Sequence, residues 1–263
     1  MAIDATTIRA VARRLDDAAR QGQAIEQVTV QMPELDLDDA YAIQAQLAAL
    51  RIARGERIAG VKMGFTSRAK MRQMGVSDLI WGRLGAGMEL PDGAVFDMST
   101  AIHPRVETEL AFILRRPLCG PVSTTEARNA IEAVLPALEI IDSRYRDFRF
   151  NVVDVVADNA SARGFVLGEP ASARMDFSNL GMVLHLDGQV VQTGSSAAIL
   201  GHPLRGLMEA ARLAGERGAR LEAGEIVLAG AATAAVALRP GCHVSATVQS
   251  LGRLGFTTTG ERS

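Results

Sequence analysis

The sequence predicts an α+β protein in which a small α-rich segment precedes a larger part built mostly of β-strands. Apolar residues recur at helical spacing over the first fifty or so residues, whereas from Met88 onward short apolar runs are separated by Gly, Pro and Asp turns. Helices and strands do not alternate regularly, so a doubly wound parallel sheet is not supported. We therefore expect an α-rich N-terminal domain at residues 1–70 and a β-rich domain at residues 71–263.

Composition limits the class of protein. The chain has 263 residues, of which 48% are hydrophobic and 22% charged, so a sizeable core can form and wholesale disorder is not expected. The formal net charge is -2 and there is no basic tract, which argues against nucleic acid and anionic membranes as partners. The N-terminus has no apolar core of signal-peptide length, and no stretch approaches about 18 uninterrupted apolar residues. We expect a soluble, cytoplasmic protein without a membrane span.

Two helices are predicted in the N-terminal part. In the first, four apolar residues share one face at helical spacing: Ile8, Val11, Leu15 and Ala18. Thr6 or Thr7 is the expected N-cap of this helix. The second helix begins near Asp38 and ends at Gly55.

The remaining chain predicts strands interrupted by short helices. Alternating residues around Asp187-Gly188 predict a β-hairpin. Apolar runs predict strands over 57–65, 103–114, 134–141 and 152–156. Helical spacing predicts helices over 69–75, 124–135 and 203–218, the second capped by Thr124 or Thr125.

Three glutamates in apolar runs are the first candidate site. Glu107 and Glu109 are two residues apart in "HPRVETELAFIL", so in a strand they share one face. They could lie on the solvent face of an edge strand, which is where charges usually lie. However, Glu139 occurs in a second apolar run, and three carboxylates on two buried strands require a cation. Mg²⁺ or Mn²⁺ prefers such oxygen ligands, and the lack of a nearby His or Cys set argues against zinc.

A polar group after the apolar run at 152–156 is the second candidate. Asp158, Asn159 and Ser161 are common turn formers, and an ordinary turn explains them equally well. In a functional interpretation, Asp158 orients a neighbour while Asn159 or Ser161 binds a polar substrate atom.

Two lysine-containing motifs remain. Lys62 lies between Gly60 and Gly64, which permit close approach of another group, although a solvated lysine is the ordinary expectation. Ser67 and Lys70 match the S-x-x-K pair of penicillin-recognising serine enzymes, but the K-T-G and S-D-N partners do not occur. We therefore give the serine-enzyme hypothesis little weight.

Several motifs together resemble one enzyme family. The segments "KMGFTSRAKMRQMGV", "HPRVETELAFIL", "ALEIIDSRYRDFRFNVVDVVADNAS", "AAILGHPL" and "ATAAVALRPG" are similar to the 4-oxalocrotonate (2-oxo-3-hexenedioate) decarboxylases. These enzymes share a fold with the vinylpyruvate hydratases and the wider fumarylacetoacetate hydrolase superfamily. The resemblance covers nearly the whole chain. It implies a rolled, mostly antiparallel β catalytic domain, like the C-terminal domain of fumarylacetoacetate hydrolase, after a small α-rich domain.

The resemblance also implies roles for particular residues. The family's metal-binding acids fall on Glu107, Glu109 and Glu139, and its active-site lysine falls on Lys62. Its Ala-Asp-Asn-Ala-Ser motif falls on residues 157–161. The implied cofactor is Mg²⁺ or Mn²⁺, and no organic cofactor is expected because the substrate carries its own electron sink.

The implied reaction is decarboxylation of 2-oxo-3-hexenedioate to 2-hydroxypenta-2,4-dienoate and CO2 in meta-cleavage catabolism of aromatic compounds. One departure keeps the alternative of a 2-hydroxypenta-2,4-dienoate hydratase open: Leu79 stands where the family usually has proline, and Asp78 adds an acid to this loop. A non-catalytic partner of such a hydratase is a third hypothesis, against which the intact acid triplet argues. The expected partners are a 2-oxo-enedioate substrate, further copies of the chain and the pathway's hydratase.

Overall fold

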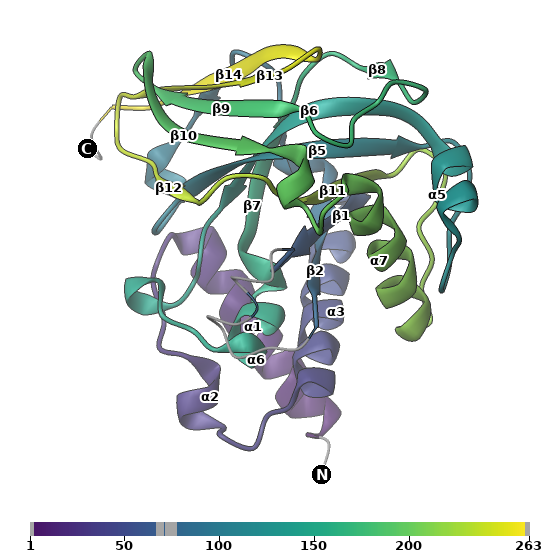
Figure 1. The fold of residues 1–263 in the computed structure, drawn as a ribbon. Helices are drawn as coiled ribbons and strands as arrows, with labels where there is room; N and C mark the ends of the chain where they lie inside the picture. The colour runs from purple at the N-terminus through teal and green to yellow at the C-terminus, as the bar shows by residue number, and fades with distance from the viewer. Residues whose placement is uncertain (1–2, 67–70, 72–77, 261–263) are drawn as a thin grey trace.

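The computed structural model describes residues 3–66, 71 and 78–260, and its N-terminal part is helical. The three helices there are α1 (Ala5–Gln21), α2 (Val28–Gln31) and α3 (Leu37–Ala53), which lie together below the sheets in Figure 1. The predicted cap of α1 is wrong, because Asp4 precedes both threonines and its carboxylate accepts hydrogen bonds from the amides of Thr6 and Thr7. Likewise α3 is capped by Asp36. In both helices an aspartate accepts from the free N-terminal amides.

The larger part is built on two sheets. The nine-stranded sheet runs β2-β1-β11-β5-β6-β7-β3, with β12 paired to β5 and β8 paired to β6. Its strands are β1 (Ile58–Gly64), β2 (Ile80–Gly85), β3 (Glu89–Leu90), β5 (Arg105–Leu114), β6 (Ile131–Ile141), β7 (Ala162–Leu167), β8 (Ala171–Ser172), β11 (Ile226–Ala231) and β12 (Val236–Ala237).

The five-stranded sheet runs β10-β9-β13-β14-β4 and covers the nine-stranded sheet at the top of Figure 1. Its strands are β4 (Val95–Phe96), β9 (Gly181–Leu186), β10 (Gln189–Ser195), β13 (His243–Val248) and β14 (Gly252–Thr258). The hairpin predicted at Asp187-Gly188 is confirmed, since it joins β9 to β10. Most pairs are antiparallel, as predicted, but β1–β11, β3–β7 and β14–β4 are parallel, so the sheets are mixed.

The later helices differ partly from prediction. They are α5 (Thr124–Ala130), α6 (Val152–Ala157) and α7 (Pro203–Glu216), and α7 agrees with the sequence pattern. Residues 131–135 begin β6 rather than extend α5, and Ser123 caps α5 in place of either threonine. The 152–156 strand is also wrong, because this segment is helix α6, whose Asn151 cap forms a capping box with Asp154. Short apolar runs do not distinguish a strand from a buried helix.

Five short 3₁₀ helices connect these elements within the described residues. They are η1 (Ala86–Met88), η2 (Met98–Thr100), η3 (Arg146–Phe148), η4 (Asn159–Ser161) and η5 (Ser196–Ala198). Turns such as η3 and η4 place their side chains beside the ends of the central strands, and both take part in the site described below.

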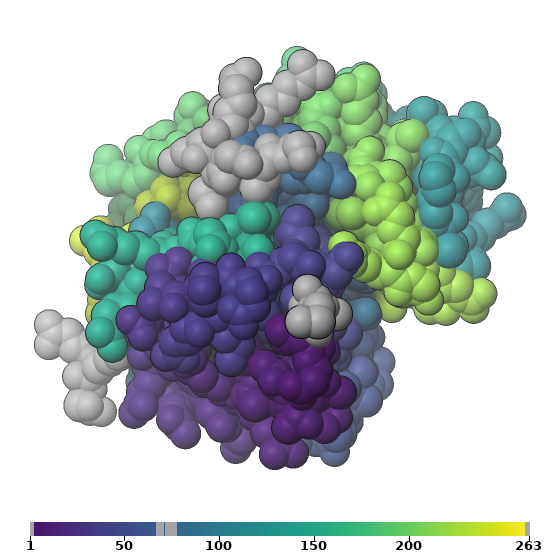
Figure 2. Space-filling model, turned by 90° about the horizontal axis from the view of Figure 1, so that it is seen from below, coloured from purple at the N-terminus to yellow at the C-terminus, as the bar shows by residue number. Residues whose placement is uncertain are grey.

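The helices and the nine-stranded sheet share a hydrophobic core. One buried cluster includes Leu15 of α1, Ile43 of α3 and Phe112 of β5, and a second fills the space between the sheets. In Figure 2, which views the molecule from below, the N-terminal helices form most of the near surface and α7 lies beside them. Because β1 belongs to the nine-stranded sheet, strand pairing already begins before residue 70. The domain division at residue 70 stays a prediction.

Two statements concern what the described part of the chain contains. None of its helices is long and apolar enough to cross a membrane. The predicted helix over 69–75, apart from Met71, and the Ser67–Lys70 motif lie outside the described residues.

Candidate metal centre

The three glutamates come together at the centre of the nine-stranded sheet. Strand β5 lies between β11 and β6, so the edge-strand interpretation is wrong. In the β5–β6 ladder, Glu107 is directly opposite Glu139, and Glu109 is opposite Ala137. The exposed fraction is 6% for Glu107 and 0% for both Glu109 and Glu139. Antiparallel pairing therefore places three buried carboxylates on one patch of a rigid scaffold.

Their oxygen atoms suit a cation. One carboxylate oxygen from each of Glu107, Glu109 and Glu139 lies within 4.8 Å of the others. Glu109 Oε2 accepts a hydrogen bond from the Gly230 amide at 2.9 Å. Glu109 Oε1 and Glu139 Oε2 are buried without a hydrogen-bond donor among the described residues. Buried acceptors without a partner are costly, and a hard divalent ion with oxygen ligands would satisfy them.

Lys62 supplies part of the missing positive charge. Its side chain projects from β1, is 4% exposed, and places Nζ 2.9 Å from Glu139 Oε1. The same ammonium donates to the Ala160 carbonyl oxygen at 3.3 Å. The interpretation of Lys62 as a solvated lysine is therefore wrong. Three ionised carboxylates and one ammonium sum to a charge of -2, which one divalent cation would neutralise.

The pKa shifts have the same cause. Burial, followed by repulsion from Glu139, raises the pKa of Glu109 well above its ordinary value. Burial also raises the pKa of Glu139, although Lys62 acts against it. For Lys62, burial alone would lower the pKa, but attraction to Glu139 and the other two glutamates outweighs it and raises the pKa. The lysine is thus held as an ammonium, while burial opposes the joint ionisation of Glu109 and Glu139.

Two glycines allow this close assembly. Gly230 has φ +120°, which other residues rarely adopt, and a Cβ there would lie 2.2 Å from Thr66 Oγ1. A Cβ on Gly82 of β2 would lie 2.5 Å from the Asn159 carbonyl oxygen. Because glycine has no side chain, the Gly230 amide of β11 can donate to Glu109, and the η4 turn can approach Lys62.

The predicted Asp158, Asn159 and Ser161 group divides into two kinds of residue. The buried Asp158 carboxylate accepts from the backbone amide and the guanidinium of Arg144, and burial raises the pKa of Asp158 to about 6. The Asn159 side chain pairs with the backbone of Arg83, accepting at 2.8 Å and donating at 2.9 Å. Only Ser161 has its side chain at the site, where its buried hydroxyl has no partner among the described residues.

The turn itself is strained. Asn159, Ala160 and Ser161 have φ values of 52°, 51° and 57°, the left-handed region that non-glycine residues rarely adopt. Such strain is retained where the surroundings hold it, frequently at functional sites. Here Arg144 holds Asp158, and the backbone of β2 holds Asn159, so that the Ala160 carbonyl and the Ser161 hydroxyl point toward Lys62 and the cavity.

A cavity of about 440 Å³ opens beside the cluster. Its polar wall contains Lys62, Glu107, Ser161 and Arg105, and its largest apolar lining residues are Phe65, Ile80, Ile141, Phe148, Phe150 and Val155. Sequence reasoning missed Arg105, although it lies two residues before Glu107 and alternation alone puts it on the same face. The Arg105 guanidinium carbon lies 4.3 Å from the centroid of the Phe148 ring. The remaining cationic wall residue, Arg149, is exposed at the mouth.

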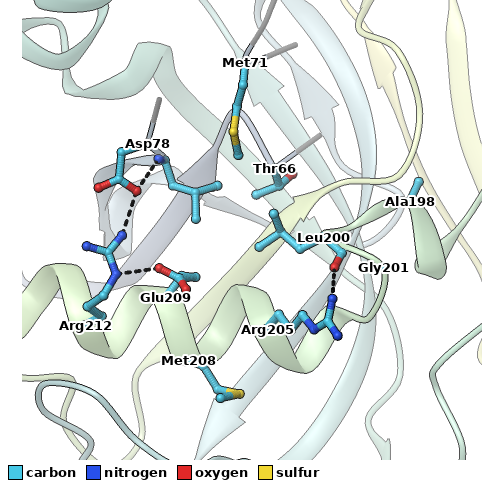
Figure 3. Close-up of a pocket in the computed structure, with 11 residues that line it drawn as sticks. Thr66, Met71, Asp78, Ala198, Leu200, Gly201, Arg205, Met208, Glu209 and Arg212 are labelled. Carbon is cyan, nitrogen blue, oxygen red and sulfur yellow. Dashed lines mark hydrogen bonds and ion pairs between the residues drawn. The ribbon is translucent and has the colours of Figure 1, made fainter. Parts of the chain in front are cut away.

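Asp78 belongs to a different hollow, of about 860 Å³, shown in Figure 3. Arg212 of α7 forms an ion pair with Asp78 at 2.7 Å and also contacts Glu209. None of the three clustered glutamates lines this hollow. Among the described residues, Asp78 therefore stands apart from the glutamate cluster, and Leu79 beside it is buried.

The comparison with known proteins agrees with this geometry. The family model for the fumarylacetoacetate (FAA) hydrolase C-terminal domain matches residues 82–258. The chain belongs to the fumarylacetoacetate hydrolase family. Within the family it is 56% identical to a 4-oxalocrotonate decarboxylase of a Pseudomonas species, over 97% of this chain and 99% of that protein. A 2-keto-4-pentenoate hydratase of Paraburkholderia xenovorans is more distant, at 39% identity over 89% of this chain and 90% of that protein.

A solved family structure is also similar. The 4-oxalocrotonate decarboxylase from Pseudomonas putida G7, complexed with magnesium and adipate, has a TM-score of 0.95 and 39% identity. The match covers 97% of this chain and 98% of that one. The predicted fold class, helices followed by a curled β domain of this family, is confirmed.

Proposed function

We propose that the chain is a divalent-metal-dependent decarboxylase that converts 2-oxo-3-hexenedioate to 2-hydroxypenta-2,4-dienoate and CO2 in meta-cleavage catabolism of aromatic compounds. The observation that carries this proposal is the buried Glu107–Glu109–Glu139 cluster, with Lys62, in the wall of a substrate-sized cavity. The 56% identical decarboxylase and the family structure with magnesium and adipate, a six-carbon dicarboxylate, support it.

The residues fit a resident Mg²⁺ or Mn²⁺, because they offer three carboxylates, two buried oxygens without a donor and an unbalanced negative charge. When bound by Glu107, Glu109 and Glu139, the ion would supply Lewis-acid stabilisation and a template for the 2-oxo acid end of the substrate. We assign the metal-ligand role to these three residues.

Lys62 is the chain's own electrophilic group. Breaking the C5–C6 bond releases CO2, and its electron pair moves through the C3–C4 double bond to the C2 oxygen, where negative charge develops. The pKa of Lys62 is raised, so it stays an ammonium and can stabilise that oxygen. One preorganised charged donor of this kind is commonly worth about 3 kcal/mol.

Arg105 is our candidate for holding the second carboxylate. Its guanidinium stacks on Phe148, and no carboxylate or carbonyl in the described ranges 3–66, 71 and 78–260 accepts a hydrogen bond from it. It is two residues from Glu107 along β5, a separation of about 7 Å. A dicarboxylate could therefore span from the acid cluster to this free donor fork, which matches carboxylate geometry.

Ser161 and the η4 turn complete the assignment. The partnerless Ser161 hydroxyl lies in the cavity wall and is our candidate for orienting the substrate or moving a proton during tautomerisation. Asp158 and Asn159 act on other residues rather than on the substrate, through Arg144 and Arg83. We assign them as positioning residues for the turn.

The test is a pair of assays with Mg²⁺ present. With 2-oxo-3-hexenedioate we expect CO2 release, and with 2-hydroxypenta-2,4-dienoate we expect little loss of the diene absorbance. The reverse result would instead establish the hydratase, a second candidate that the 39% identical hydratase keeps open. Activity on neither substrate would contradict both.

Partners and location are also proposals. We propose that copies of the chain self-associate and that they form a complex with the pathway's hydratase in the cytoplasm. Support comes from the family resemblance, and co-purification of the two proteins with measurement of the complex mass would test it. A monomer that does not bind the hydratase would contradict the proposal.

A further inference from the structure

A second polar cavity, of about 290 Å³, lies between α1, α3 and β7. Five arginines but only two acids are among its lining residues: Arg20, Arg51, Arg54, Arg144 and Arg163, with Asp16 and Glu56. It shares no lining residue with the catalytic cavity. This cavity therefore has an excess of positively charged groups, whereas the glutamate cluster has an excess of negatively charged ones.

Four of the five arginines have an acidic partner: Arg20, Arg51, Arg54 and Arg144. Arg54 binds Asp16 through two hydrogen bonds of 2.7 and 2.8 Å, and Arg144 is paired with Asp158. Arg20, which is exposed, lies 3.9 Å from Asp17. Arg20, Arg54 and Arg144 can be explained by the fold alone.

Arg51 and Arg163 are less fully satisfied than the other three. The Arg51 side chain is only 14% exposed, and its Nε is 3.8 Å from an Asp16 carboxylate that Arg54 already occupies. Arg163 donates two hydrogen bonds to Thr100, to its carbonyl at 3.2 Å and to its hydroxyl, but the buried Nε of Arg163 has no acceptor among the described residues. Both guanidinium groups therefore face one cavity with donors that have no hydrogen-bond acceptor among the described residues, and for the buried Nε of Arg163 this is costly unless something accepts from it.

The pKa shifts of Arg51 and Arg163 also indicate that their positive charge is poorly compensated at this cavity. Burial, followed by repulsion from Arg144, lowers the pKa of Arg51. For Arg163, burial also lowers the pKa, and Arg144 adds to this effect against the attraction of Asp142. A helix C-terminus attracts cations, which accounts for Arg51 in the last turn of α3. It does not account for Arg163, which lies on strand β7.

We propose that this cavity binds a small dianion, either phosphate or a short dicarboxylate, between Arg51 and Arg163. Both ligands present paired oxygens, and a guanidinium fork donates two parallel hydrogen bonds to such groups. Arg144 extends from this cavity to Asp158, next to the η4 turn. Only Arg144 would therefore separate a bound anion from Asp158, which supports the η4 turn in the wall of the catalytic cavity. The proposal does not depend on the proposed function.

The experiment is calorimetric titration of the metal-free protein with inorganic phosphate and, separately, with succinate. With phosphate we expect saturable binding to one site and a rise in Tm. Succinate is titrated into Arg105→Met, because the proposed function lets a dicarboxylate also bind beside Arg105. Arg51→Met and Arg163→Met should each weaken binding by at least about tenfold. Arg105→Met, in the catalytic cavity, is the matched control and should leave phosphate binding unchanged. Comparison of the two titrations identifies whether the site prefers phosphate or a carboxylate.

A further variant covers the case in which loss of a buried arginine prevents folding. Ala19 lines the cavity from α1, so Ala19→Glu would place a carboxylate of the chain's own there. We expect this variant to raise the Tm of the ligand-free protein and to abolish phosphate binding. The proposal is overturned if the wild type binds neither anion at millimolar concentration, or if Ala19→Glu and the arginine variants bind as the wild type does.

Discussion

The protein contains two buried ionic clusters within the same fold, and they differ in charge balance. In one, Arg144 and Asp158 neutralise each other, and the guanidinium also donates to the backbone carbonyls of Asp158 and Ala162. In the other, Glu107, Glu109 and Glu139 lie together, and the Lys62 ammonium forms an ion pair with Glu139. The residues of both clusters are buried, so burial alone does not distinguish them.

This difference in charge balance indicates that one cluster suits a structural role and the other suits a ligand. A balanced pair with its donors and acceptors satisfied positions the chain and requires nothing more. An unbalanced cluster with oxygens that lack donors is tolerated in a native protein when function requires it. Charge balance and hydrogen-bond satisfaction, rather than the presence of buried charges, are therefore the useful criterion here.

The largest effect is expected when one carboxylate of the unbalanced cluster is neutralised. Glu107→Gln or Glu109→Gln should lower activity by about 10²–10³-fold or more and weaken Mg²⁺ binding, because a charged ligand is lost. Without metal, Glu109→Gln should raise the Tm, since it replaces a carboxyl group that is costly to ionise at this buried site and keeps the Gly230 hydrogen bond. Thermal unfolding with and without Mg²⁺, together with turnover, measures this. Near wild-type turnover in either variant would refute the ligand assignment.

The opposite result is expected at the balanced cluster. Arg144→Met should lower the free energy of unfolding by about 3–5 kcal/mol, because Asp158 would remain buried without its cation. The pKa of Asp158 is already raised to about 6 from an ordinary 3.8 and would rise further. For an acid with a raised folded-state pKa, stability falls as pH rises above the unfolded value.

The loss in Arg144→Met should therefore be smaller near pH 4, close to the ordinary 3.8 of an aspartate, than at neutral pH. Urea unfolding of the variant and the wild type across this range measures it. The double variant Arg144→Met/Asp158→Asn, which removes both charges and keeps an acceptor, should recover part of the loss. An equal loss at both pH values would contradict the account.

Substitution of Lys62 tests the unbalanced cluster by removing a positive charge rather than a negative one. Lys62→Met should slow turnover by about 10²-fold, which corresponds to about 3 kcal/mol for one electrostatic group. Metal affinity should not fall, because Lys62 competes with the ion for Glu139. Steady-state kinetics and calorimetric Mg²⁺ titration separate the two effects, and unaltered kinetics would remove Lys62 from the site.

The smallest expected effect concerns the free guanidinium beside the cluster. Arg105→Met should raise KM by about tenfold, or ~1.4 kcal/mol, with a smaller change in kcat, because it removes a contact made in the bound substrate. Adipate should lose affinity while hexanoate, which has one carboxylate, should not. Arg146→Met, on the η3 turn outside the cavity, is the control. Equal loss for both ligands would argue that Arg105 serves only packing.

Local pattern predicted the parts of the site that lie within single strands. Glu107 and Glu109 share a face by alternation, and the apolar run around Glu139 indicated a second buried strand, so the acid cluster was predictable. The direct Glu107–Glu139 register was not, because pairing depends on contacts far apart in sequence.

The long-range partners could not be predicted from spacing. Lys62 reaches Glu139 only because β1 pairs with β11 and β11 with β5, an order that the sequence does not state. Arg144 as the partner of Asp158 was missed for the same reason, since their side chains meet across a turn and a short helix. The helix α6 was missed because its apolar run is as short as a strand.

Part of the cavity wall comes from a segment other than the strands that carry the three acids, and this has a consequence for how new activities arise. The three acids are fixed by the β5–β6 ladder, whereas Phe148, Arg149 and Phe150 come from the connection that follows it. On the proposed function, substitutions in that connection should alter which organic acid is accepted without moving the three acids. Grafting residues 146–150 between relatives is therefore the economical first step in redesigning selectivity on this scaffold.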